Sequence, residues 1–309
     1  MAEDRIRIER TQNLWASFER KFEPIAKAME LDSDPQIGLD QIGGLSAAKE
    51  EIQTYACAAT DPAVYGRWGT YPPSGLLLIG HRGVGKRQLA KSLATQTGSG
   101  FLCVTVPRLV LEMMHEAGKV GEMLAGWSHA LTEMPRLTIL FNELEFSQAQ
   151  EIGARRPDLP VGPVMDFLLD LVDRSVAAEN HLVVGSTSHP DTLRQAFVQP
   201  GRFERVVEVT ADYPGDLVEA LMIHSASSEK RAGERLFDEV DWKLVVERYR
   251  EPVAGDWIRI MHAVLRRKAR SDAAGENPSL VTTQDLLDEV DRYRRANNQI
   301  IAPQSGNYV

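Results

Sequence analysis

The chain has 309 residues, of which 43% are hydrophobic, and its net charge is −9. This length suits two domains, or one large domain with an appendage, and the apolar content is ample for a core. The acidic balance argues against non-specific nucleic-acid binding as the main task. The chain lacks an apolar run of membrane-spanning length, and its charged start is unlike a signal peptide. With only two distant cysteines, Cys57 and Cys103, we expect a reduced, cytoplasmic setting and no membrane partner.

The first 35 residues predict an amphipathic helix followed by a linker. Apolar side chains recur at roughly helical spacing through residues 1–30, and Pro24 should kink or interrupt that helix. The run Leu31-Asp32-Ser33-Asp34-Pro35 then breaks it. We expect the helix to pack on its own domain or on a neighbour, because its heptads are too few to predict a coiled coil.

Residues 38–210 alternate between short apolar strands and helical stretches. Candidate strands fall at 75–79, 101–106, 137–141, 181–187 and 205–209, and helical patterns near 46–58, 86–97, 108–117, 121–133 and 163–175. Such alternation predicts a parallel sheet that is covered on both faces. From about residue 214 the strand pattern stops. Four helical patterns follow, near 214–229, 241–249, 255–271 and 283–297, and a loose polar end occupies 298–309.

A phosphate-binding loop is the most informative motif. The run Gly80-His81-Arg82-Gly83-Val84-Gly85-Lys86-Arg87 matches G-x-x-x-x-G-K-[ST] except at its last position. It lies between an apolar strand pattern and a helical pattern, which is the context that the motif requires. The glycines let backbone N–H groups converge on phosphates, and Lys86 would reach the β- and γ-phosphates. Arg87 replaces the hydroxyl that should hold Mg²⁺, so the loop suits nucleotide binding better than hydrolysis.

Two further segments make the chain resemble the AAA family of ATPases over residues 38–297. Leu39-Asp40-Gln41-Ile42-Gly43-Gly44-Leu45 is similar to the family's entry segment, and residues 191–205, which end in Pro-Gly-Arg-Phe-Glu-Arg, are similar to its second region of homology. The resemblance implies an α/β fold of the P-loop NTPase type. A five-stranded parallel sheet would occupy residues 36–212, and a small helical lid residues 213–297. Family members usually form hexameric rings that bind ATP at subunit boundaries.

The resemblance also assigns roles to individual positions. Residues implied in binding ATP or ADP are Ile42, Gly43, Gly80, Gly83, Val84, Gly85, Lys86, Arg87 and Ser188. Glu143 matches the base that activates water, while Arg202 and Arg205 match the two arginine fingers that reach the next subunit. Asn142 stands at the metal-holding position, where a neutral amide is a poorer Mg²⁺ ligand than the usual carboxylate. Lys119 replaces the aromatic residue of the central-pore loop.

Three departures, Arg87, Asn142 and Ser188, surround one reaction centre, and they leave three functions open. The first is a ring subunit that binds ATP, hydrolyses it poorly and donates arginine fingers to a neighbour, either a copy of itself or an intact AAA paralogue. The second is an active protein remodeller, since Lys86 and Glu143 remain and Mg²⁺ usually keeps several waters. The third is a non-catalytic adaptor in which Arg87 pairs with Glu143.

The last four residues, Gly306-Asn307-Tyr308-Val309, are similar to the tail of actinobacterial proteasome-activating ATPases. That similarity implies docking to a proteasome core through Tyr308 and the carboxylate of Val309. The alternative is a disordered end that happens to carry a tyrosine.

Overall fold

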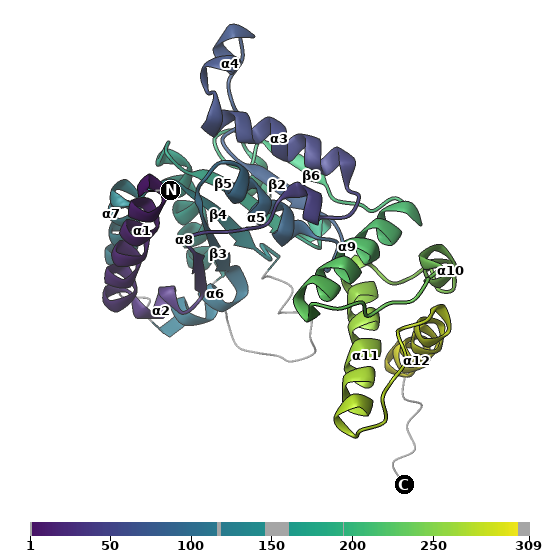
Figure 1. Ribbon diagram of the computed structural model, residues 1–309. Helices are drawn as coiled ribbons and strands as arrows, with labels where there is room; N and C mark the ends of the chain where they lie inside the picture. The colour runs from purple at the N-terminus through teal and green to yellow at the C-terminus, as the bar shows by residue number, and fades with distance from the viewer. Residues whose placement is uncertain (1, 116–118, 146–160, 194, 302–309) are drawn as a thin grey trace. The chain divides into compact units, whose positions relative to one another are not determined.

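The computed structural model describes residues 2–115, 119–145, 161–193 and 195–301, which form two compact units (Figure 1). The first unit comprises residues 1–39, 46–81 and 86–209, and the second comprises residues 40–45, 82–85 and 210–309. Among the described residues, none of the helices is both long and apolar enough to cross a membrane.

The first unit contains every strand of the sheet. The strands are β1 (Met29–Asp32), β2 (Leu76–Ile79), β3 (Gly100–Thr105), β4 (Leu137–Asn142), β5 (Leu182–Thr187) and β6 (Arg205–Glu208). Its α-helices are α1 (Ala2–Lys21), α2 (Glu23–Ala26), α3 (Ser46–Thr60), α4 (Ala63–Arg67), α5 (Lys86–Gln96), α6 (Val106–His115), α7 (Val120–Glu133) and α8 (Val161–Ala177). Short 3₁₀ turns occupy Leu39–Gln41, Pro190–Thr192 and Gln195–Val198.

The sheet has the strand order β1-β3-β4-β5-β2-β6. All strands other than β1 are parallel to one another. All six residues of β5 are buried, so both faces of this strand are covered. Full burial explains why the central strands are continuous apolar runs rather than alternating ones. The α/β fold predicted from the sequence is therefore confirmed. Strands β4, β5 and β2 are neighbours in the sheet, so the residues that follow them lie at the same sheet edge.

The segment around residue 30 differs from the sequence-based expectation of helix followed by linker. Residues 29–32 form β1, a sixth strand that pairs antiparallel with β3 and sets Met29 opposite Val104. The edge of β3 supplies the backbone hydrogen bonds that make this short segment a strand. Burial of Met29 favours the same conformation. The helix itself ends at Lys21, ahead of Pro24, which lies in the first turn of α2.

Helix α1 packs on α7 through aromatic side chains. The rings of Phe18 and Trp127 lie 5.8 Å apart at a steep angle, and both are buried. The ring of Phe22 approaches Gly126 so closely that a Cβ there would lie 2.1 Å from a ring carbon. This contact explains a glycine inside a helix, where it otherwise lowers stability.

The second unit is helical. Its helices are α9 (Gly215–Ala232), α10 (Trp242–Glu247), α11 (Ala254–Ala273) and α12 (Thr283–Ile301). Its core is apolar, and α11 contributes four of its buried side chains: Trp257, Ile260, Met261 and Val264. Their spacing of three and four residues sets them on one face of α11, which leaves the opposite face for polar residues.

Candidate nucleotide-binding site

The glycine-rich loop joins the end of β2 to the start of α5. Gly80, directly after β2, has φ 150°, and a Cβ there would lie 2.3 Å from the carbonyl oxygen of Val209. Gly83 and Gly85 have φ values of 88° and 113°, which also favour glycine. A loop of this backbone shape, followed by a helix N-terminus, is suited to anion binding.

Lys86 begins α5, and the residue is only 8% exposed. Its ammonium donates to the carbonyl oxygens of Gly80 at 2.5 Å and His81 at 3.0 Å, and to Ser188 Oγ at 3.0 Å. The structure thus brings Lys86 together with Ser188, which were predicted separately from the sequence. These three contacts hold the Lys86 ammonium at the loop, where a charge-assisted hydrogen bond to a bound phosphate can form.

Arg87 lies in the first turn of α5 and forms an ion pair with Glu30 of β1. The distance from Arg87 Nη2 to Glu30 Oε2 is 2.6 Å, and both side chains are substantially exposed. Glu30 is paired in register with Cys103 of β3. Burial raises the pKa of the Cys103 thiol to about 11, so this cysteine is a neutral thiol and not a nucleophile near pH 7.

Asn142 and Glu143 follow one another at the end of β4. Asn142 Oδ1 accepts a hydrogen bond from Ser186 Oγ at 2.9 Å, and Ser186 Oγ accepts from the backbone N–H of Glu143 at 3.4 Å. Glu143 has φ 62°, an uncommon value for a non-glycine residue and one that functional sites often contain. Because Ser186 belongs to β5, its hydrogen bond fixes the Asn142 side chain against that strand.

Glu145 belongs to the same cluster, although the sequence analysis did not select it. Its Oε1 accepts the backbone N–H of Ser188 at 3.0 Å. Its Oε2 is buried, and within the described part of the chain it has no hydrogen-bond partner. Ser188 thus connects Lys86 on one side with Glu145 on the other. The available signal was a second acidic residue two positions after Glu143.

These residues do not fit a protein-held Mg²⁺ ion. A guanidinium stands where a hydroxyl ligand is expected, and it is paired with Glu30. An amide stands where a carboxylate is expected, and its oxygen already accepts a hydrogen bond. Among the described residues, no group of three or more His, Cys, Asp or Glu side chains is placed to hold a metal ion. The loop and Lys86 suit phosphate groups, whereas the metal positions lack the hard oxygen ligands that Mg²⁺ prefers.

Arg202 and Arg205 are both paired with carboxylates of their own chain. Arg202 forms a two-pronged pair with Asp173 of α8, at 2.5 and 2.8 Å, and donates to the Ala196 carbonyl at 2.7 Å. Arg205 forms a two-pronged pair with Glu51 of α3. The Arg202 side chain is 19% exposed and that of Arg205 is 55% exposed. Arg205 is therefore the more accessible of the two.

Ile42 and Gly43, which the resemblance implies in nucleotide binding, lie in the second unit. Ile42 is buried, and a Cβ on Gly43 would lie 2.4 Å from the Cα of Ala220 in α9. Asp216 Oδ2 accepts the Leu45 backbone N–H at 2.9 Å. The close approach to Ala220 explains a glycine at position 43. Val84 is also buried, and the Gly83 carbonyl accepts the backbone N–H of Gly255 at 3.0 Å.

The sequence analysis also selected a lysine before α7 and two residues at the C-terminus. Lys119 is exposed and precedes α7 directly. Tyr308 and Val309 lie outside the described residues.

A parallel sheet with a glycine-rich loop, and a lysine at the start of the following helix, defines a P-loop nucleotide-binding protein. Residues 76–211 match the model of the ATPase family associated with various cellular activities (AAA). The chain therefore contains an AAA ATPase domain, and it is homologous to proteasome-activating nucleotidases.

Archaeal proteins are among its relatives. The proteasome-activating nucleotidase of Methanocaldococcus jannaschii is 32% identical over 208 residues, which cover 65% of this chain and 46% of that protein. The proteasome-activating nucleotidase of Methanothermobacter thermautotrophicus is 28% identical over 272 residues, or 87% of this chain and 63% of that protein. Protein CdcH of Halobacterium salinarum is 27% identical over 283 residues, which cover 87% of this chain and 37% of that protein. The chain therefore spans less than two thirds of each of these relatives.

Proposed function

We propose that this chain is a ring-forming AAA subunit that binds ATP or ADP with little help from Mg²⁺ and hydrolyses ATP poorly. The observation that carries the proposal is the contrast between two adjacent residues. Lys86 is buried and held for phosphate, whereas Arg87, at the metal-holding position, is paired with Glu30. Selective loss of the metal contacts beside an intact phosphate lysine favours binding over turnover.

In this proposal Arg205 is the finger that acts on a neighbouring subunit. An exposed ion pair such as Arg205–Glu51 is worth only about 0–1 kcal/mol. Its exchange for a γ-phosphate would therefore cost little. Arg202 makes three hydrogen bonds and is mostly buried, so it serves as a positioning residue that fixes the segment before β6.

Nucleotide titration of the purified full-length chain, in excess EDTA and in excess Mg²⁺, tests the proposal. We expect similar affinities in both conditions, and loss of binding in Lys86→Ala. Lys91→Ala is the matched control, because this lysine lies one turn further along α5 and pairs with Asp32. Absence of nucleotide binding in the wild-type chain would favour an adaptor instead.

Turnover of Mg-ATP by the same preparation tests the second half of the proposal. Loss of about 3 kcal/mol of transition-state stabilisation slows a reaction by roughly 10²-fold. We therefore expect turnover well below about 1 s⁻¹, the low end of the usual range for enzymes. A faster rate that Glu143→Gln abolishes would instead establish an active remodeller.

Proteasome docking is a second candidate function, favoured by relatives whose name is proteasome-activating nucleotidase. It would use Tyr308 and Val309, with ring multivalency raising a weak tail affinity. Deletion of the last three residues should then abolish co-purification with a proteasome core. Unchanged capture after this deletion would exclude docking through the tail.

A further inference from the structure

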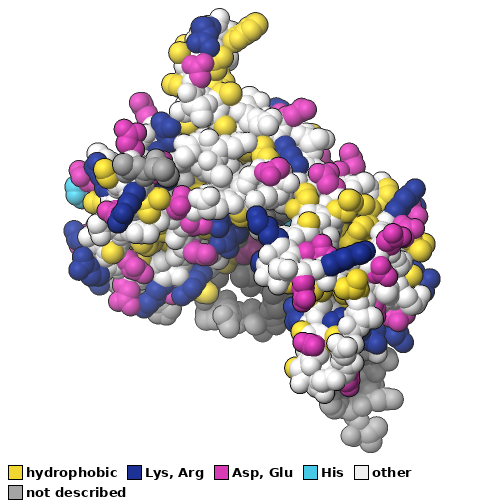
Figure 2. Space-filling model, viewed as in Figure 1, with side chains coloured by type: hydrophobic (Ala, Val, Ile, Leu, Met, Phe, Trp, Pro, Cys, Tyr) yellow, Lys and Arg dark blue, Asp and Glu magenta, His cyan; other side chains and the backbone are white. Residues whose placement is uncertain are grey.

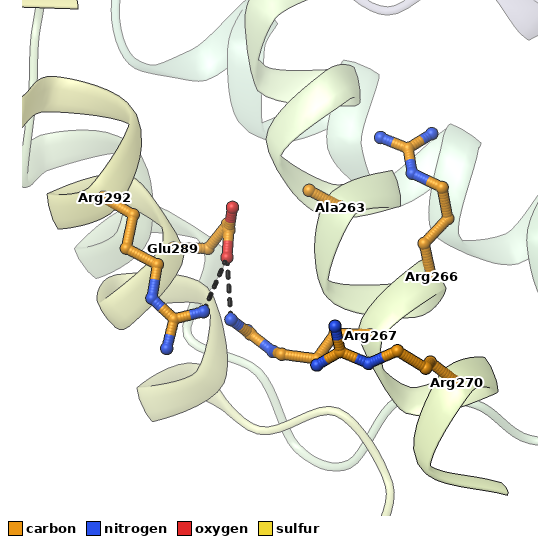
Figure 3. Close-up of a pocket in the computed structure, with 6 residues that line it drawn as sticks. All are labelled: Ala263, Arg266, Arg267, Arg270, Glu289 and Arg292. Atoms are coloured by element: carbon orange, nitrogen blue, oxygen red, sulfur yellow. Dashed lines mark hydrogen bonds and ion pairs between the residues drawn. The ribbon is translucent and has the colours of Figure 1, made fainter. Parts of the chain in front are cut away.

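A groove between α11 and α12 of the second unit is rich in arginine (Figure 3). Its volume is about 310 Å³, and six residues line it: Ala263, Arg266, Arg267, Arg270, Glu289 and Arg292. We call this set the arginine groove. Four arginines and one glutamate line it, so their formal charges sum to three positive charges in a chain whose overall net charge is −9.

Glu289 already shows how the groove binds a carboxylate. Arg267 of α11 and Arg292 of α12 both reach its Oε2, at 2.8 and 3.5 Å, from two different helices (Figure 3). A single carboxylate oxygen thus serves two cations. The planar guanidinium is the side chain best matched to carboxylate geometry.

The other two arginines have no such partner. Among the described residues, no carboxylate lies within ion-pair distance of Arg266 or Arg270, and both side chains are exposed. Lys268, between them in the sequence, is paired with Asp285 at 2.9 Å. Figure 2 shows Lys and Arg side chains interspersed with Asp and Glu on the visible face.

Positive charge also extends from the groove towards α9. Burial, together with the charges of Arg231 and Arg266, lowers the pKa of His262, which lies one turn before Arg266 on α11. His262 is therefore neutral near pH 7 and does not compete for an anion. Its titration nevertheless reports on whether the charge of Arg266 has been neutralised.

We propose that the arginine groove binds an acidic peptide segment of a partner protein, with glutamate or aspartate carboxylates on Arg266 and Arg270. Glu289 occupies Arg267 and Arg292, so the groove offers a ligand the exposed guanidiniums of Arg266 and Arg270, and a carboxylate matches each in charge and geometry. A peptide can space its carboxylates around Glu289. The groove volume is within the range of ligand sites, about 300–1,000 Å³. This inference does not depend on nucleotide binding at Lys86.

A fluorescently labelled octaglutamate peptide, titrated into the full-length chain at low salt, is the probe. We expect saturable binding that weakens as salt rises, because exposed charge pairs are screened. The double variant Arg266→Gln/Arg270→Gln should weaken binding by about tenfold or more, equivalent to the loss of about 1.4 kcal/mol. Arg294→Gln/Arg295→Gln is the matched control, since it removes the same charge from exposed positions of α12 outside the groove. The control should change the affinity by less than about twofold.

A second measurement distinguishes peptide binding in the arginine groove from non-specific electrostatic attraction to the protein. The pKa of His262, followed by NMR, should rise when the peptide binds, because carboxylates neutralise Arg266. Equal losses in the two double variants would overturn the proposal, and so would an unshifted His262 at saturation. Tripolyphosphate or single-stranded DNA binding at the groove more tightly than the peptide would overturn it as well.

Discussion

Arg87 Nη2 lies 2.6 Å from Glu30 Oε2, although 57 residues separate the two in the sequence. The pair joins the first turn of α5 to β1, the strand that is added antiparallel to the sheet edge. One turn further along α5, Lys91 pairs with Asp32 of the same strand at 2.6 Å. Two carboxylates of β1 thus hold two cations of the helix that follows the phosphate loop.

The first prediction is that Glu30→Gln tightens ATP binding in EDTA. Removing the carboxylate frees the Arg87 guanidinium for phosphate oxygens. Because the pair is exposed, the gain should be modest, up to about fivefold in affinity. Nucleotide titration by calorimetry in excess EDTA measures it.

Asp32→Asn is the matched control, because it removes the neighbouring carboxylate from the same strand but leaves Arg87 paired. We expect no change in affinity for this variant. Weaker binding in Glu30→Gln would mean that the ion pair supports the loop rather than competing with the nucleotide.

The second prediction is that Arg87→Thr together with Asn142→Asp restores Mg²⁺-dependent nucleotide binding. The hydroxyl and the carboxylate are hard oxygen ligands of the kind that Mg²⁺ prefers. The affinity ratio between Mg²⁺ and EDTA conditions should rise by about tenfold over that of the wild-type chain. Each single variant should give a smaller effect. A ratio unchanged in the double variant would show that these positions do not face the cation.

Much of the fold could be predicted from the sequence, because the central strands are apolar runs that alternate with helical patterns. Strand β1 could not, because Met29–Asp32 is short and owes its conformation to the edge of β3. The same limit applies to the site. The motif identifies Lys86 and Arg87, but the partner of Arg87 comes from a segment that the sequence analysis took for helix. Glu145 was missed because its contact with Ser188 depends on the pairing of distant strands.

The third prediction distinguishes the two candidate finger arginines by stability. Arg202→Gln should lower the free energy of unfolding by about 2 kcal/mol, because hydrogen bonds to charged groups are worth about 1.5–3 kcal/mol. Arg205→Gln should lower it by less than about 1 kcal/mol, as expected for an exposed pair. Urea unfolding of the two variants measures both values. Asp173→Asn should reproduce the loss seen in Arg202→Gln, and equal losses for Arg202→Gln and Arg205→Gln would contradict the distinction.

The fourth prediction concerns His181, which precedes β5 and bridges two other elements. Its Nδ1 accepts the Leu137 backbone N–H at 3.0 Å, and its Nε2 lies 2.8 Å from the Leu131 carbonyl oxygen. The acceptor role of Nδ1 places the single proton on Nε2, so the ring is neutral in the folded protein. Burial is the main cause that lowers the pKa of His181 below its ordinary value of 6.5.

The sign of the pH effect follows from this lowered pKa. In the unfolded chain the imidazole takes up a proton as the pH falls through about 6.5, whereas the folded protein resists protonation until a lower pH. The free energy of unfolding should therefore decrease from pH 7 towards pH 5, by at most about 1.4 kcal/mol per pH unit for this group. His224 and His262 have pKa values lowered in the same direction and add to the total slope.

The contribution of His181 is isolated by comparing slopes rather than stabilities. His181→Gln should flatten the dependence of the free energy of unfolding on pH between 5 and 7, even where the variant is less stable at every pH. His129→Gln, which replaces an exposed histidine of α7, is measured alongside it as the control substitution. Urea unfolding at several pH values gives all three curves. A slope in His181→Gln equal to that of the wild type would show that this imidazole is protonated as readily in the folded chain as in the unfolded one.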